Sequence, residues 1–389
     1  MLWRGLFYNL LWSTAFLLPF NPAWIGILAA ITSVFWLAAW VSGQVAPRLG
    51  TGTTVVSLVY AAYLSGMYLF VYKDVPGLAK TFETRAGFWL GLIFVWGIRW
   101  PHEKLLSLYR ALRTGLDLSL SLCLLTGIGR SLWYGNLEKL VYSDLSLFMH
   151  PGYLAALVFL MWRMEIFLNS GTLWRQALYV GMLLLLATKA VWGAWLCSVV
   201  VGFFLKDPAF IRFRFTTFQK LLGLSLLIFA SFLLLPRLSE TWGEMQGLWP
   251  EKKYNSSLLV RFNIWEVGLK LLPKAGLTGL GETALRQRLL LEYSEKNLDV
   301  PFKHQYNLHN QFLEEWLLHG LLGCCLWVLV MMGVVPVGKT TPSLWLAWLF
   351  LFLCWGFSES FLQRSLGCLW AGFVWPLLTC LSKKYRSEA

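Results

Sequence analysis

Charged residues are scarce in this chain, and several charged or metal-binding motifs are missing. Only 14% of its 389 residues are Asp, Glu, Lys or Arg. The sequence contains no D-x-D pair, no C-x-x-C spacing and no phosphate-binding loop of the G-x-x-x-x-G-K-[ST] type. These absences argue against a nucleotide-driven transporter and against a cysteine-ligated metal centre. We therefore expect neither a bound metal nor a cofactor.

Neither the cysteines nor the basic residues indicate a disulfide-stabilised or nucleic-acid-binding protein. The 7 cysteines all lie in apolar runs, which predicts small buried side chains rather than a disulfide framework. The net charge is +13, but no run of Lys and Arg resembles a nucleic-acid patch. The positive charge instead predicts a membrane orientation and attraction to anionic membrane lipids. We expect no nucleic-acid partner.

Apolar and aromatic residues dominate what is present. Hydrophobic residues make up 57% of the chain, which includes 23 tryptophans. Runs long enough to cross a bilayer recur along it, and they predict an all-α polytopic membrane protein with about 12 transmembrane helices. The expected spans are 6–20, 22–41, 54–72, 86–100, 115–129, 146–162, 173–188, 190–205, 219–236, 312–336, 343–357 and 366–382.

One long polar stretch divides these spans into two groups. Residues 1–236 hold the first nine, 237–311 form a large and partly helical loop, and 312–389 hold the last three and a tail. With the N-terminus inside, the inner loops carry roughly 16 Lys and Arg residues and the short outer loops roughly 7. Positive charge concentrates on the cytoplasmic side. We therefore expect both termini inside and the 237–311 loop outside.

The loop begins with an amphipathic pattern at 257–272. Its apolar positions recur at spacings of four and three, which predicts a helix ended by Pro273 and the glycines that follow. Arg261 lies beside the apolar stripe, where its guanidinium can offer a two-pronged contact to a phosphate. The alternative interpretation is an exposed arginine at the edge of an amphipathic helix.

A second helix is expected over 282–297, carrying Arg286 and Arg288. Its simplest interpretation is a solvated basic face, although that face also suits a phosphorylated surface. Two histidines nearby have ordinary explanations. His304 is expected to be an exposed loop residue, and His319 is expected to serve packing or a contact between helices.

The chain leaves the loop at His309-Asn310 and enters an apolar helix. A helix N-terminus presents unpaired N–H groups and the positive end of a dipole, so it stabilises an anion nearby. A histidine placed there suits a general base working beside a phosphate. His309 is therefore the expected catalytic residue, with Asn310 as a supporting neighbour.

Two outer turns add polar groups. Lys189 follows Thr188 between two apolar runs, where a lysine either reaches the surface or lines a polar cavity. Glu359 and Arg364 share the turn between the last two spans. They either pair with each other or orient a catalytic neighbour.

These features together resemble the O-antigen ligase and O-antigen polymerase superfamily of bacterial envelope glycosyltransferases. The resemblance rests on the H-N-x9-G-x-x-G pattern at 309–323, the R-x-x-x-W pattern at 261–265 and the Pro/Gly-rich segment at 273–281. It is strengthened by their order within one outer loop of a protein with about 12 spans. It implies a GT-C-like fold in the bacterial inner membrane, with the active site facing the periplasm.

The resemblance also implies a role for each matching residue. His309 would activate the acceptor hydroxyl, and Arg261 would contact a diphosphate linked to a lipid. The family has a further arginine after a Ser or Thr, and Lys189 stands there in this chain. Lysine keeps the charge but loses the two-pronged geometry. The donor would be a glycan on undecaprenyl diphosphate, and the acceptor would be the lipid A-core of lipopolysaccharide.

Three functions remain open on the sequence. An O-antigen ligase is preferred because of the chain length, the single large loop and the arginine-bearing helix at 282–297. A polymerase would use the same donor chemistry on another undecaprenyl-linked repeat unit. A flippase or exporter would instead spread charged residues through the middle of many helices, whereas here they gather in the loops.

Overall fold

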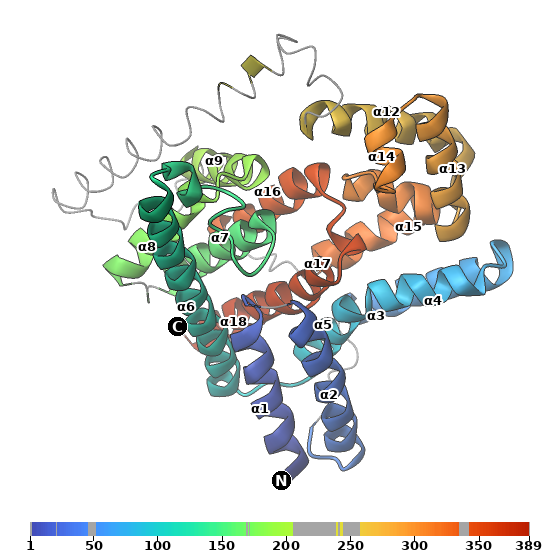
Figure 1. Cartoon of the computed structure of the whole chain (residues 1–389). Coiled ribbons are helices and arrows are strands. Elements are labelled where there is room, and N and C mark those ends of the chain that lie inside the picture. Colours follow the sequence, from blue (N-terminus) through green and yellow to red (C-terminus); the bar gives the residue numbers. More distant parts are fainter. Residues whose placement is uncertain are drawn as a thin grey trace.

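The chain is built from α-helices. The computed structural model describes residues 2–20, 22–45, 52–168, 170, 172–204, 239, 242–243, 257–333 and 342–388, and within these ranges no β-strand occurs. In chain order the helices are α1 (Leu2–Leu17), α2 (Pro22–Val41), α3 (Gly52–Gly66), η1 (Met67–Val71), α4 (Val75–Thr84), α5 (Ala86–Trp96), α6 (His102–Tyr134), η2 (Leu137–Leu140), α7 (Pro151–Leu168), α8 (Leu173–Leu185), α9 (Lys189–Phe204), α12 (Ser257–Ala275), α13 (Glu282–Glu295), α14 (Asp299–Lys303), α15 (Gln311–Gly333), α16 (Pro342–Ser358), η4 (Phe361–Gln363), α17 (Ser365–Leu369), η5 (Trp370–Val374) and α18 (Trp375–Glu388). Figure 1 shows α12, α13 and α14 gathered at one end of the molecule, which we call the loop end.

Several helices have the length and composition of membrane spans. Within the described ranges, those long and apolar enough to cross a bilayer are Thr54–Val71, His102–Tyr134, Pro151–Leu168 and Gln311–Met332. A bilayer offers the backbone no water to bind, so a spanning segment must satisfy its own N–H and C=O groups, as a helix does. The all-α class and the membrane character agree with the sequence. The expected total of about 12 spans stays a prediction.

One expected span belongs to a longer helix, and another lies outside the described residues. The span expected at 115–129 belongs to the much longer helix α6, because Leu105, Leu108 and Leu112 continue its buried face toward the N-terminus. The short boundary was wrong because it followed the uninterrupted apolar run and overlooked this amphipathic first half. The span expected at 219–236 lies outside the described residues.

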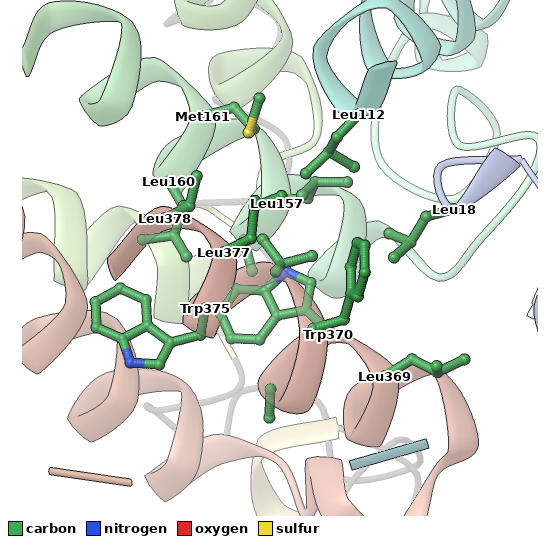
Figure 2. Close-up of a cluster of buried hydrophobic side chains, with 14 of the residues drawn as sticks. Leu18, Leu112, Leu157, Leu160, Met161, Leu369, Trp370, Trp375, Leu377 and Leu378 are labelled. Carbon is green, nitrogen blue, oxygen red and sulfur yellow. The ribbon is translucent and has the colours of Figure 1, made fainter. Parts of the chain in front are cut away.

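The core forms where the C-terminal helices meet α7. Every residue from Pro151 to Glu165 in α7 is buried, which places this helix at the centre. Figure 2 shows Leu157, Leu160 and Met161 of α7 facing the Trp370–Leu378 segment. Because lipid is as apolar as leucine, such helices are held by close packing rather than by the hydrophobic effect alone.

The loop residues have a small core of their own. Ile264, Val267 and Leu271 of α12 are buried against Leu285 and Leu289 of α13, together with Leu317 and Leu318 of α15. The expected helices at 257–272 and 282–297 are thus both present, close to their predicted boundaries. Their shared core fixes the loop unit on the first turns of α15, so Arg261 and His309 belong to one packed unit.

The end of α12 differs from the prediction. Pro273 lies inside the last turn, and the helix continues to Ala275 before Gly276 adopts a left-handed φ of 54°. The prediction that Pro273 and the following glycines end the helix is confirmed for Gly276, but Pro273 itself does not end it because a single missing N–H near a helix end leaves the preceding turns intact. The chain that follows binds α15, where Leu280 donates to the Leu317 carbonyl at 2.8 Å and Gly281 donates to the Leu318 carbonyl at 3.0 Å.

The glycine of the α15 motif makes this docking possible. Gly320 has a φ of 72°, and a Cβ there would collide with the Leu277 carbonyl. A side chain at Gly320 would therefore be strained and would also push the 276–281 segment away. Gly320 of the motif thus has a structural role, because it kinks α15 where the 276–281 segment packs against this helix.

Candidate functional site

Asn310 is the cap that starts α15. Its side-chain oxygen accepts a hydrogen bond from the Leu313 backbone N–H at 3.0 Å, as an N-cap asparagine does. One residue earlier, His309 has a positive φ of 45°, an unfavourable conformation for a residue with a Cβ. The Asn307 side chain supports it by accepting the His309 backbone N–H at 3.1 Å. Such strain is characteristic of functional positions.

Three charged or titratable side chains from separate segments meet beside this helix start. The Glu359 carboxylate lies 3.5 Å from Nδ1 of His309 and 4.0 Å from the Arg261 guanidinium. Arg261 comes from α12, His309 precedes α15, and Glu359 follows α16. We call these residues the surface charge cluster. The structure thus joins two residues expected from the sequence with Glu359, which was expected only as a supporting group.

The cluster is accessible to a ligand. The side chains of Arg261, His309 and Glu359 are 31%, 17% and 11% exposed. A 3.5 Å contact is long for a hydrogen bond, but catalytic hydrogen bonds often tighten only when substrate binds. An anionic or hydroxyl-bearing molecule could therefore reach these side chains from solvent.

Electrostatics keep the Glu359 carboxylate ionised. Burial alone would raise the pKa of Glu359, but the neighbouring His309 imidazole and Arg261 guanidinium lower it below its ordinary value. An ionised carboxylate facing Nδ1 favours the tautomer with the proton on Nδ1. Nε2 of His309 is then left with a lone pair, as a general base requires.

Glu359 does not pair with Arg364 as one interpretation of the sequence proposed. Among the described residues, the ion-pair contacts of Glu359 are those with His309 and Arg261. Arg364 is exposed at the end of η4. Glu359 thus takes the other expected role, that of orienting a neighbour.

Lys189 lies toward the same end of the helices as Glu359. α9 begins at Lys189 and packs against α16. A Cβ on Gly193, one turn into α9, would lie 3.7 Å from the Cys354 sulfur, which is close to the end of α16. The start of α9 and the turn after α16 therefore share one end of this helix pair, with Lys189 exposed there.

Arg286 has a different role from the one expected. Its guanidinium contacts Glu314 of α15 at 2.6 Å and Glu282 of α13 at 2.9 Å, and it donates to the Gln363 side chain at 3.2 Å. The prediction of a solvated basic face was wrong for Arg286 because α15 supplies a buried carboxylate opposite it. Arg286 ties the loop unit to α15 and η4. Arg288 is exposed on α13, as expected.

The turn carrying Glu359 is fixed to the start of α15 by two hydrogen bonds. The Asn310 backbone N–H donates to the Ser360 hydroxyl at 3.0 Å, and the Leu362 backbone N–H donates to the Gln311 side chain at 2.7 Å. Ser360 and Gln311 are fully buried. These bonds hold Glu359 beside His309, a function of Gln311 and Ser360 that sequence reasoning missed.

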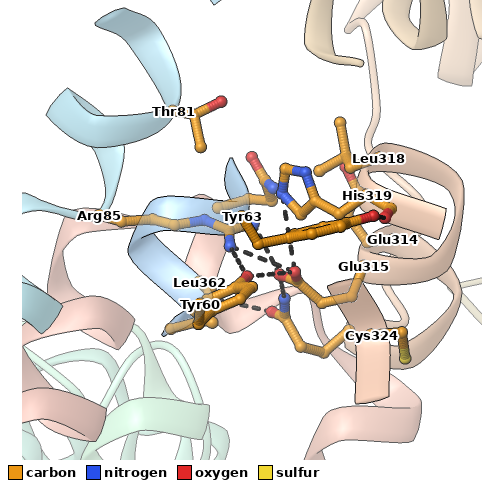
Figure 3. Close-up of polar contacts among 12 residues, drawn as sticks. Tyr60, Tyr63, Thr81, Arg85, Glu314, Glu315, Leu318, His319, Cys324 and Leu362 are labelled. Carbon is orange, nitrogen blue, oxygen red and sulfur yellow. Dashed lines mark hydrogen bonds and ion pairs between the residues drawn. The ribbon is translucent and has the colours of Figure 1, made fainter. Parts of the chain in front are cut away.

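Gln311 also belongs to a polar network around Glu315, and Figure 3 shows Tyr60 and Arg85 of this network meeting Glu315. The Gln311 amide donates to Glu315 at 2.8 Å, and Glu315 forms an ion pair with Arg85 at 2.6 Å and accepts from the Tyr60 hydroxyl at 2.9 Å. We call Tyr60, Arg85, Gln311 and Glu315 the buried network. Arg85 is 1% exposed and Glu315 is fully buried. The sequence signal was weak, because Arg85 and Glu315 are charged residues next to apolar runs but have charged neighbours in the sequence.

His150 is another residue near the site that sequence reasoning missed, because it fell inside an expected span. It precedes α7, and the following Tyr153 packs against Trp355 of α16 with ring centroids 4.9 Å apart. Loss of water around the ring lowers the pKa of His150, and Arg364, Arg261 and His309 reinforce this against the opposing effect of Glu359. All four groups therefore lie within electrostatic range of His150.

The remaining histidines near the loop behave as expected. His304 is exposed after α14, and His319 is fully buried, 3.7 Å from Glu315 in the same helix. Within the described ranges, no group of three or more His, Cys, Asp or Glu side chains is arranged to hold a metal ion. The cysteines are free thiols.

Comparison with known proteins adds no assignment. No protein-family model and no curated protein matches this chain.

Proposed function

We propose that this protein is a glycosyltransferase of the O-antigen ligase type. Its donor would be a glycan carried on undecaprenyl diphosphate, and its acceptor the lipid A-core of lipopolysaccharide. The observation that carries the proposal is the meeting of Arg261, Glu359 and His309 beside the N-terminus of α15. A base oriented by a carboxylate and a cation for a phosphate are the groups such a transfer needs.

In the proposed reaction, an acceptor hydroxyl oxygen attacks the anomeric carbon of the donor sugar. The new carbon–oxygen bond forms as the bond between that carbon and the diphosphate oxygen breaks. Nε2 of His309 takes the hydroxyl proton, and Glu359 stabilises the imidazolium through Nδ1. Direct attack inverts the anomeric configuration.

The leaving diphosphate keeps the bonding electrons and gains negative charge. Arg261 offers it a two-pronged contact, and Lys189 and Arg364 add positive charge at the same end of the molecule. The N-terminus of α15 contributes its dipole. These fixed groups stabilise the negative charge of the leaving diphosphate. In other enzymes a metal ion can do this, but the sequence suggests no metal ligand here.

The proposed location is the bacterial inner membrane, with the loop end in the periplasm. A transferase working outside the nucleotide pool needs a donor that is already activated and held in the membrane, and a polyprenyl diphosphate glycan meets this need. Thiol labelling tests the orientation in a variant without native cysteines. Asn297→Cys should react with an impermeant reagent once the outer membrane is opened, whereas Arg110→Cys should not. The reverse pattern would contradict the proposal.

The experiment that tests the function is the lipopolysaccharide profile of cells lacking the protein. Loss of all polymer from the lipid A-core supports the ligase, whereas cores capped by a single repeat unit support the polymerase. An unchanged profile would exclude both. Reintroducing His309→Ala should fail to restore polymer, while the exposed neighbour variant His304→Ala should restore it.

A further inference from the structure

The imidazole of His150 is held in a defined orientation. Its Nδ1 accepts a hydrogen bond from the Gly152 backbone N–H at 3.2 Å. A nitrogen that accepts a backbone N–H carries a lone pair, so the proton of the neutral ring is on Nε2. His150 as a residue is exposed, although protein atoms remove part of the water around its ring, so a ligand can reach the Nε2–H. His150 is thus a fixed hydrogen-bond donor.

Packing places this donor beside the surface charge cluster. A Cβ on Gly152 would lie 3.8 Å from the Trp355 indole nitrogen, and Tyr153 packs edge-on against the same indole. Trp355 in turn stacks on Phe361 with ring centroids 5.0 Å apart. Glu359 lies in the turn between Trp355 and Phe361. The start of α7 is therefore fixed against the segment that carries Glu359.

The neighbours of His150 favour an anionic ligand. Arg261 and Arg364 are close enough to influence its pKa, and Glu359 is the carboxylate that does so. Two guanidinium groups outnumber one carboxylate, and that carboxylate already faces His309. Loss of water keeps the pKa of His150 low, so its Nε2–H donates from a neutral ring.

We propose that His150 binds the diphosphate of the lipid-linked donor through its Nε2–H, beside Arg261 and Arg364. The two histidines then have opposite tautomers. Nε2 of His309 accepts a proton from the acceptor hydroxyl, while Nε2 of His150 donates a hydrogen bond to a phosphate oxygen. The inference rests on the proposed function for the identity of the donor lipid.

Two substitutions separate this role from a structural one. An asparagine side chain ends near the Nδ1 position, and a glutamine side chain reaches the Nε2 position. His150→Asn can keep the contact with Gly152 but loses the outward donor, whereas His150→Gln keeps the outward donor and loses the contact. A residue that merely caps α7 should tolerate asparagine better. A residue that binds diphosphate should tolerate glutamine better.

The test is binding of farnesyl diphosphate, a short polyprenyl diphosphate, to the purified full-length protein in detergent. We expect His150→Asn and His150→Ala to weaken binding about tenfold or more, the size of one hydrogen bond to a charged group, and His150→Gln to stay close to wild type. His304→Asn is the matched control and should bind normally. Farnesol should bind all variants equally poorly.

The other outcomes distinguish the two proposals. Normal binding by His150→Asn, with or without loss in His150→Gln, would overturn the role of His150 and leave the proposed transferase standing. If the wild type does not discriminate farnesyl diphosphate from farnesol, the proposed donor itself is wrong, and the role of His150 falls with it. An unfolding temperature measured for each variant shows whether a loss of binding reflects loss of fold.

Discussion

The surface charge cluster and the buried network lie at the same end of α15, yet they are built differently. In the network, Arg85 meets Glu315 at 2.6 Å with both side chains almost fully buried. In the cluster, Glu359 stands 3.5 Å from His309 and 4.0 Å from Arg261, and all three remain partly exposed. The groups of the network are in close contact with one another, whereas those of the cluster are farther apart and partly exposed.

This difference indicates which charges serve structure and which serve chemistry. A charge buried away from water is tolerated only with close partners, so the buried network must be complete to exist at all. A catalytic cluster needs unfilled hydrogen-bonding capacity for substrate, and longer contacts supply it. Gln311 connects the two, because it binds Glu315 below and the Leu362 backbone beside Glu359 above.

The largest expected effect follows from removing the base of the cluster. His309→Ala should lower the rate of glycan transfer by about 10²–10⁴-fold, the usual contribution of a general base. Donor binding and the unfolding temperature should change little, because the His309 side chain makes a long contact with Glu359 and an edge-on contact with Tyr306 rather than a close ion pair. Transfer rates of the purified variant, with His304→Ala as control, provide the measurement. Near-normal transfer would remove His309 from the mechanism.

The second-largest expected effect is a loss of stability when the ion pair of the buried network is broken. Arg85→Met leaves the Glu315 charge buried without its ion-pair partner and should destabilise the protein by about 3–5 kcal/mol. The double variant Arg85→Met with Glu315→Gln should recover much of this loss, because the unpaired charge is gone. Denaturation in detergent measures the order of stability of these variants, with Lys80→Met, at an exposed lysine, as a control that should unfold like wild type. An Arg85→Met variant as stable as wild type would contradict a structural role.

A smaller effect is expected from changing the shape of a cation in the cluster. Arg261→Lys keeps the charge but loses the two-pronged contact, so donor affinity should fall about tenfold. Lys189→Arg should be tolerated or should improve donor binding, because it adds the geometry that the lysine lacks. Titration of each variant with farnesyl diphosphate compares them. Equal affinity for Arg261→Lys and wild type would argue against a two-pronged contact.

The smallest expected effect is that of metal removal. A divalent ion bound at the cluster would add positive charge there and make the cluster more like the network, in which each charge has a close partner. The sequence contains no D-x-D pair to hold such an ion. Transfer in excess EDTA should match transfer with added Mg²⁺ or Mn²⁺. A strong and reversible requirement for either ion would mean that an acidic site was overlooked. Glu359 and Glu266 would be the first residues to substitute.

Local features of the site were predictable because they depend on neighbouring residues. The start of α15 at His309-Asn310 follows from a polar residue able to cap an apolar helix, and Asn310 does cap it. The helix bearing Arg261 follows from apolar periodicity. The structural role of Arg286 was not predictable, because its buried partner Glu314 lies in another helix and no local pattern connects them.

The sequence by itself determined the helical class, the membrane character, the loop helices and the helix start that presents His309. These properties follow from composition and from periods of three and four residues, which act within one segment. Only the tertiary structure decided that Glu359 faces His309 and that Gln311 binds the turn that carries Glu359. The tertiary structure alone also placed His150 near the surface charge cluster. Each of these contacts joins segments far apart in the chain, so it depends on how whole helices pack, and short-range patterns do not encode that packing.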